Sequence, residues 1–161
     1  MKLCMCFCAI LAFLSPINCG DDEEAERLFG EDVKKGAEEC LNDHKVEDDD
    51  YQALKKFECP QSEVGKCFMK CMLQKMEMMK EEQFCADGFL ERAKGWLKHN
   101  PEKYSKVEKM MNTCKGEVEN EYKPSPEDKC GVSVAVMKCF HKHEKETEKL
   151  RAILEKISKE D

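Results

Sequence analysis

The residues SEVGKCFMKCMLQKMEMM, at positions 62–79, carry the most regular apolar pattern in this 161-residue chain. Ser62 is a residue that helices favour as an N-cap, and the apolar side chains after it recur at helical spacing. The side chains that fall close to one face are Val64, Phe68, Met72, Met76 and Met79. The stretch therefore predicts an amphipathic helix that packs this face against the rest of the protein.

Two cysteines lie on this helix, Cys67 and Cys71, four residues apart. They project from one face at different heights along the axis, which makes a bond between them awkward. Cys130 and Cys139 are nine residues apart, which in a helix places them about 13 Å apart along the axis, so they cannot pair either. Each of these cysteines must bond to another part of the chain, and such cross-links can hold separate helices around a cavity.

Apolar spacing and cap residues predict further helices on both sides of this one. The expected ranges are 22–41, 48–59 and 88–99. Asn100 and Pro101 then form the cap and the first turn of another helix. Because nearly every apolar segment has this helical spacing, we expect the chain to be all-α.

A second cap signature predicts the helix that follows. Ser125 precedes Pro126, and an acidic residue stands three positions after the serine, so the helix should run from Pro126 past Cys139. Three valines alternate there in the manner of a strand: Val132, Val134 and Val136. The cap signature and the lack of a partner strand favour a helix.

The first twenty residues have the order of a secretory signal peptide. Lys2 precedes an apolar run from Leu3 to Leu14, and a short polar group ends at Gly20. The run is too short to cross a bilayer comfortably, and four acidic residues follow Gly20 directly. We therefore expect residues 1–20 to be removed and the mature protein to be secreted and extracellular, with no later segment inserting into a membrane.

Charge and motifs exclude several function classes. The chain has a net charge of −7, and its lysines are interspersed with glutamates, which argues against nucleic acid as a partner. It contains no G-x-S-x-G, H-E-x-x-H or phosphate-binding glycine loop. We therefore expect neither an enzyme nor a bound cofactor.

Loss of the signal peptide leaves eight of the twelve cysteines, an even number that predicts disulfides in an exported chain. A zinc site is disfavoured because no C-x-x-C pair is present. His141 and His143 are two positions apart, so they project from different faces of a helix. We therefore expect no metal site. The eight cysteines are Cys40, Cys59, Cys67, Cys71, Cys85, Cys114, Cys130 and Cys139.

Six of these cysteines are spaced in a way that resembles the six-cysteine signature of insect odorant-binding proteins. Their successive gaps are 26, 3, 42, 15 and 8 residues, and the gaps of 3 and 8 are the most characteristic. The resemblance extends to about His141 and implies a six-helix fold around a buried apolar pocket. It also implies the disulfides Cys40–Cys71, Cys67–Cys130 and Cys114–Cys139.

The chain departs from the family pattern in two ways. The gap of 15 residues before Cys130 is slightly long, and Cys59 and Cys85 are additional. These two cysteines lie beyond opposite ends of the predicted 62–79 helix, so a bond between them needs a loop that folds back. A fourth disulfide Cys59–Cys85, free thiols and intermolecular bonds all stay open.

Methionine is the most informative residue type for the expected pocket. The chain has ten methionines, and this flexible, polarizable side chain suits a pocket that accepts varied ligands, although it is also ordinary helix core. We chose candidate lining residues from the expected inward faces of the last four helices of the main body. They are Phe68, Met72, Met76, Phe89, Leu90, Trp96, Met110, Met111, Val134, Met137 and Phe140.

The sequence thus predicts a signal peptide (1–20), a helical domain similar to odorant-binding proteins (21–141) and a charged amphipathic tail (142–161). The tail is expected to form an added helix. The predicted function is carriage of small apolar molecules, of odorant or pheromone type, in extracellular fluid. The alternative is a secreted salivary, venom or reproductive protein that uses the same fold to bind a protein partner. A homodimer and a receptor contact are left open.

Overall fold

The computed structural model describes residues 21–55 and 58–144. These residues form six helices and one short hairpin, so the predicted all-α fold is confirmed. The helices are α2 (Asp21–Asp43), α3 (Asp48–Lys55), α4 (Glu63–Lys75), α5 (Asp87–Trp96), α6 (Pro101–Glu121) and α7 (Gly131–Glu144). The hairpin between α4 and α5 consists of β1 (Met79–Lys80) and β2 (Gln83–Phe84). The predicted signal peptide and residues 145–161 of the predicted tail lie outside the described residues, whereas residues 142–144 continue α7.

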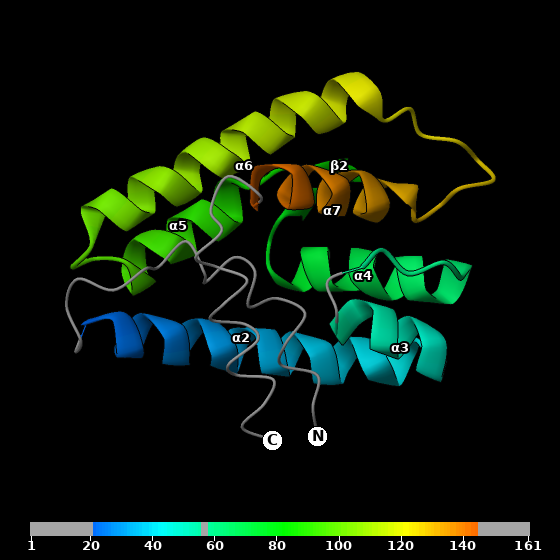
Figure 1. Ribbon diagram of the computed structural model, residues 1–161, viewed down its shortest axis with the longest axis horizontal. Helices are drawn as coiled ribbons and strands as arrows, with labels where there is room; N and C mark the ends of the chain where they lie inside the picture. The colour runs from blue at the N-terminus through cyan, green and yellow to red at the C-terminus, as the bar shows by residue number, and fades with distance from the viewer. Residues whose placement is uncertain (1–20, 56–57, 145–161) are drawn as a thin grey trace.

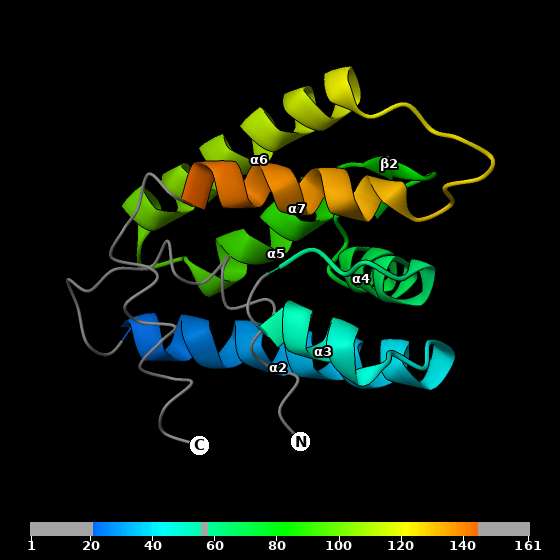
Figure 2. The ribbon, with the colours of Figure 1, turned by 45° about the vertical axis from the view of Figure 1, so that its right-hand side comes forward.

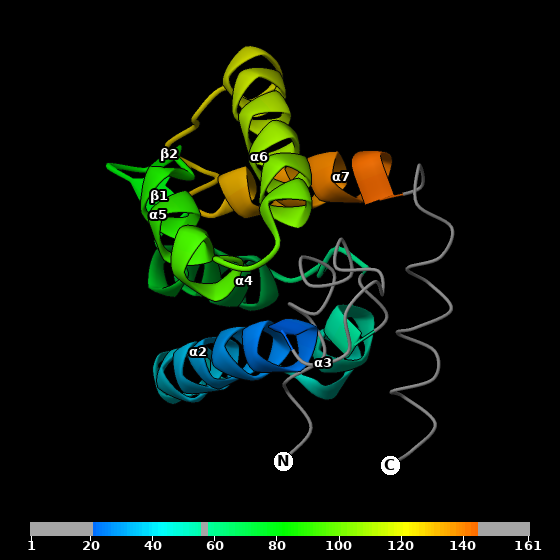
Figure 3. The same cartoon turned by 90° about the vertical axis from the view of Figure 1, so that its left-hand side faces the viewer.

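The helices are stacked in layers (Figure 1). The long helix α2 lies along one side of the molecule, and α4 and α5 cover its two halves and contact it. Helix α7 packs against α4, and α6 packs against α7 and α5. The turned view shows α7 between α6 and the α4–α5 layer (Figure 2), and the end-on view shows α3 beside α2 (Figure 3). The apolar core lies between these layers.

Two helix starts follow the cap residues of the sequence. Ser62 caps α4, because its hydroxyl oxygen accepts a hydrogen bond from the backbone N–H of Gly65 at 2.9 Å. Asn100 caps α6 through the N–H of Lys103 at 3.1 Å, and Pro101 occupies the first turn. These predicted boundaries are confirmed.

The predicted extension of the 62–79 helix to Met79 is wrong. Helix α4 ends at Lys75, and Glu77 takes a left-handed backbone conformation with φ of 58°. The amide of Met78 donates to the carbonyl of Leu73, and that of Glu77 to the carbonyl of Gln74, which together form a Schellman motif. The chain then reverses into β1, so Met79 belongs to a strand and is half-buried.

The predicted start of the last helix at Pro126 is also wrong. Helix α7 begins at Gly131, and Ser125 instead closes a turn. The hydroxyl of Ser125 accepts from the amide of Glu127 at 3.3 Å, and its carbonyl accepts from the amide of Asp128 at 3.1 Å. The same serine that resembled a helix cap therefore stabilises a turn. The valine-rich segment after it is helical, as predicted.

The first turn of α4 is held by the preceding segment rather than by the apolar face. The carboxylate of Asp50, in α3, accepts hydrogen bonds from the hydroxyl of Ser62 and from the backbone amide of Gln61 at 2.9 Å. Gly65 faces Asp50 and Pro60, so Val64 on the other side is 42% exposed. The prediction that Val64 joins the buried stripe is therefore wrong.

Candidate ligand-binding site

The predicted lining residues come together in the interior, with one exception. Nine of the eleven are buried in a single apolar cluster contributed by α4, α5, α6, α7 and the turn after α4. Trp96 is half-buried and packs against this cluster. Val134 is half-buried and is not part of it among the described residues. The nine are Phe68, Met72, Met76, Phe89, Leu90, Met110, Met111, Met137 and Phe140.

The interior is rich in methionine, which α4, the turn after it and α6 contribute to one buried cluster. Met72, Met76 and Met111 are at most 1% exposed. A methionine side chain has three rotatable bonds and a polarizable sulfur, so a surface lined by it can adjust to guests of different shape. This composition gives the interior an apolar, adaptable character with few groups that could hydrogen-bond to a guest.

Aromatic side chains frame the cluster on two sides. Phe29 of α2 makes edge-to-face contacts with Phe89 and Trp96 of α5, at centroid distances of 6.3 and 5.3 Å. On another side, Phe84 of β2 contacts Phe140 of α7 at 6.0 Å. Such contacts join elements that are distant in the sequence.

One face of Trp96 is covered by a charged side chain. The guanidinium carbon of Arg92 lies 5.5 Å from the centre of the Trp96 ring. Arg92 also forms ion pairs with Asp32 of α2 and with Glu77, the latter at 3.5 Å. Arg92 therefore links the Trp96 ring of α5 to α2 and to the residues that follow α4.

Sequence reasoning missed several large, fully buried residues of the same cluster. Met69 and Leu73 lie on α4, and Met78 and Phe84 lie on either side of the hairpin loop. Phe29 of α2 and Leu54 of α3 lie on helices outside the four from which the lining residues were chosen. No periodic signal marks Met78 or Phe84, because the chain leaves the helical repeat at Glu77.

Three disulfides hold the layers together. They are Cys40–Cys71 between α2 and α4, Cys67–Cys130 between α4 and the start of α7, and Cys114–Cys139 between α6 and α7. This is the pairing that the family resemblance implies. Every bond joins separate helices, so the walls of the interior are linked covalently.

Cys59 and Cys85 are free thiols in the structure, so the fourth disulfide that the sequence left open is not formed. Both are half-buried. Burial raises the pKa of the Cys59 thiol, while the nearby Lys138 acts in the opposite direction. The Sγ atom of Cys85 lies 3.3 Å from a carboxylate oxygen of Asp87.

Layers of helices, three inter-helix disulfides and a methionine-rich interior define a class of small, covalently linked helical domains with an apolar centre. The model of the PBP/GOBP family matches residues 23–143, and the chain belongs to this family. The resemblance drawn from the cysteine spacing is thereby confirmed.

Two individual proteins are similar to this chain. General odorant-binding protein 19d of Drosophila melanogaster is 26% identical over 111 residues, which cover 68% of this chain and 70% of that protein. The fold is similar to that of Odorant-binding protein dmelOBP28a from Drosophila melanogaster, with a TM-score of 0.56 and 20% identity. That match covers 76% of this chain and 96% of the solved one.

Among residues 21–55 and 58–144, no helix combines the length and the apolar character that crossing a membrane requires.

Proposed function

We propose that this protein is a secreted carrier that binds small hydrophobic molecules, of odorant or pheromone type, between α4, α5, α6 and α7. The ligand makes apolar contacts with the methionine-rich cluster, and each methylene that it buries contributes about 0.8 kcal/mol. Release into the surrounding fluid is then a matter of equilibrium and requires no covalent step. No catalytic role is proposed.

The observation that supports this proposal most strongly is the membership of the PBP/GOBP family, over residues 23–143. Two features of the described residues agree with it. The interior is apolar and lined by flexible methionines, and the helices around it are cross-linked by three disulfides. Cross-linked walls allow an apolar guest to enter and leave without loss of the fold.

The alternative, a secreted protein that binds a protein partner, is not favoured by the comparisons. A contact through the charged tail would involve residues 145–161, which lie outside the described residues. A carrier role also accounts for the concentration of methionine in the interior, which a partner-binding surface would not require.

The test is binding of the fluorescent apolar probe N-phenyl-1-naphthylamine to the mature chain, followed by displacement with long-chain alcohols and esters. A carrier takes up the probe with saturation at one molecule per chain and releases it to these competitors. Met110→Ala should weaken probe binding by about fivefold, because a buried contact of about 1 kcal/mol is lost. The matched control is Val64→Ala, which changes an exposed apolar side chain and should leave binding unchanged.

Failure of the folded wild-type chain to take up the probe would remove the basis for a carrier. Equal weakening by both substitutions would place the probe outside the interior. Circular dichroism of each variant shows whether its helices are intact, so loss of binding is not confused with loss of the fold.

A further inference from the structure

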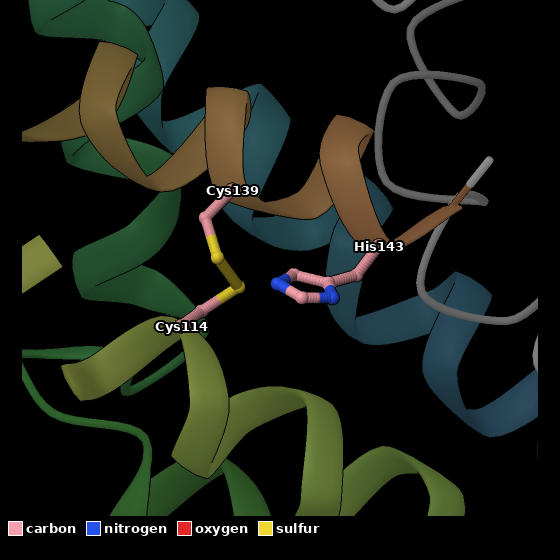
Figure 4. Close-up of side chains that lie close together, drawn as sticks. All are labelled: Cys114, Cys139 and His143. Atoms are coloured by element: carbon pink, nitrogen blue, oxygen red, sulfur yellow. A yellow bond between two sulfur atoms is a disulfide. The ribbon is translucent and has the colours of Figure 1, made fainter. Parts of the chain in front are cut away.

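Four potential metal ligands meet where α6 crosses α7. Cys114 and Glu117 lie three positions apart on α6, and Cys139 and His143 lie four positions apart on α7. Residues at these spacings project from the same face of a helix, so each helix presents two ligand groups to the other. Figure 4 shows the imidazole of His143 directed toward the Cys114–Cys139 disulfide.

The distances between these groups fit a tetrahedral ion. The Sγ atoms of Cys114 and Cys139 and a ring nitrogen of His143 lie within 4.8 Å of one another. His143 Nε2 is 3.0 Å from Glu117 Oε1, and Cys139 Sγ is 3.6 Å from Glu117 Oε2. A zinc ion with bonds of about 2.0 Å to nitrogen and 2.3 Å to sulfur holds its ligand atoms about 3.3–3.8 Å apart. On reduction the two bonded sulfurs have to separate, and the other ligand atoms, which lie between 3.0 Å and 4.8 Å from one another, have to adjust to these spacings.

Charge and burial also suit an ion at this place. The Glu117 carboxylate forms an ion pair with Lys142 and lies 3.0 Å from the imidazole of His143. A divalent ion bound by two thiolates and one carboxylate leaves one negative charge, and Lys142 Nζ lies 3.0 Å from Glu117 Oε2 to balance it. Both cysteines are buried, whereas the side chains of Glu117 and His143 are about a quarter exposed, which gives the ion a route from solvent.

We propose that reduction of the Cys114–Cys139 disulfide creates a zinc site made of Cys114, Cys139, His143 and Glu117. A dithiol reductant supplies two electrons and two protons; the S–S bond breaks, two thiols form, and the reductant becomes a disulfide. Zn²⁺ then binds both sulfurs, and their two protons pass to solvent. The ion replaces the covalent link between α6 and α7, so this part of the fold persists under reducing conditions. The site is separate from the proposed ligand-binding interior and does not depend on the carrier function.

Sequence patterns did not indicate this site, because they paired His141 with His143. The proposed site depends on the four-residue spacing between Cys139 and His143 on α7. It also depends on α6, which the fold places beside α7. A comparable group at the other end of α7 contains Glu63, Cys67 and Cys130. It has three ligands and no histidine, and therefore serves as an internal comparison.

The experiment uses the mature chain, residues 21–161, reduced with excess dithiol and then freed of reductant under nitrogen. Co²⁺ is added as a spectroscopic substitute for zinc. The expected result is one Co²⁺ per chain, with the intense visible bands of tetrahedral coordination and a thiolate charge-transfer band, both removed by Zn²⁺. The oxidised chain should give neither band. Absence of these bands from the reduced chain contradicts the proposal.

Variants assign the ligands. His143→Gln and Glu117→Gln should each lower the zinc affinity of the reduced chain by about tenfold or more. His141→Gln, a change of the same kind two positions away on α7, should leave the affinity unchanged. If His141→Gln weakens binding as much as His143→Gln does, the assigned ligands are wrong.

A final measurement separates a folded site from unspecific binding by thiols. Alkylation in the presence of zinc, read by peptide mass spectrometry, should leave Cys114 and Cys139 protected and modify Cys67 and Cys130. Circular dichroism should show that zinc preserves helix content that the reduced chain loses when a chelator is added. Protection of Cys67 and Cys130 instead, or a helix content that zinc does not affect, overturns the proposal.

Discussion

Asp50 and Gly65 lie so close together that a Cβ atom on Gly65 would stand 2.6 Å from Asp50 Oδ2. The absence of a side chain at Gly65 therefore allows the carboxylate to approach the first turn of α4. There it receives hydrogen bonds from Ser62 and Gln61, and so joins α3 to α4. This contact fixes the start of the helix that carries Cys67 and Cys71.

Gly65→Ala should lower the free energy of unfolding by about 1–3 kcal/mol, because the new methyl group displaces Asp50 or Pro60. Gly116→Ala is the matched control, since a Cβ there meets nothing within 4 Å and alanine favours the helix. It should raise the same free energy by about 0.5–1 kcal/mol. Urea unfolding followed by circular dichroism measures both. If Gly116→Ala lowers the free energy of unfolding as much as Gly65→Ala does, this account is contradicted.

Asp50 should also contribute a pH dependence to stability. Burial acts to raise the pKa of its carboxyl, but hydrogen bonds from Ser62 and Gln61 outweigh it, and the pKa falls below the ordinary value of 3.8. Because the unfolded chain then binds the proton more readily than the folded one, the stabilisation is present above pH 3.8 and is lost as the pH falls through the folded pKa.

The difference in unfolding free energy between the wild type and Asp50→Asn should therefore shrink as the pH is lowered from 5 toward the acid limit of folding, roughly pH 2–3. Asp49→Asn, an exposed neighbour on the same helix, should show a much smaller change. A difference that is constant over this range would mean that the Asp50 carboxylate is not stabilised in the folded state.

The two thiols outside the disulfide framework should be detectable without reductant. Denatured, non-reduced mature chain should incorporate two iodoacetamide groups, at Cys59 and Cys85. In the folded chain, Cys59 should react slowly near neutral pH, since burial raises its pKa and the thiolate is the reactive form. Mass spectrometry of labelled peptides distinguishes the two positions. No incorporation into the denatured chain would indicate a fourth disulfide or an intermolecular bond.

The hairpin loop stores backbone strain that a substitution can relieve. Glu81 and Glu82 have φ angles of 50° and 67°, a conformation that asparagine and glycine adopt more readily. Glu81→Asn should raise the unfolding free energy by about 0.5–1 kcal/mol. Glu82→Asn should raise the unfolding free energy by less, because it also removes the ion pair with Lys70. Thermal unfolding compares the two, and a larger gain at Glu82 would contradict this assignment.

Sequence patterns predicted those parts of the fold that depend on local chemistry. The caps at Ser62 and Asn100 act within one turn of their own helix, so their role is readable without knowledge of the neighbours. The end of α4 is different, because the left-handed residue is Glu77 rather than glycine and is paired with Arg92 from α5. Nothing in the local sequence distinguishes this glutamate from a helical one.

Tertiary context also decided which apolar residues face the centre. Helical spacing correctly placed Met72, Met76 and Met111 inside, since a stripe identifies the buried side of a helix. It could not find Phe84, whose burial depends on a hairpin that brings it against Phe140. It also assigned Val64 to the interior, although the first turn of α4 is fixed through Gly65.

The claim that an apolar guest occupies the methionine-rich interior can be tested directly with methyl-labelled methionine. Addition of a long-chain alcohol to the mature chain should shift the methyl resonances of Met72, Met76 and Met111 with saturation at one ligand per chain. The half-buried Met79 should respond less. Resonances of the buried methionines that stay unchanged at saturating alcohol, or shifts confined to Met79, would contradict the carrier function.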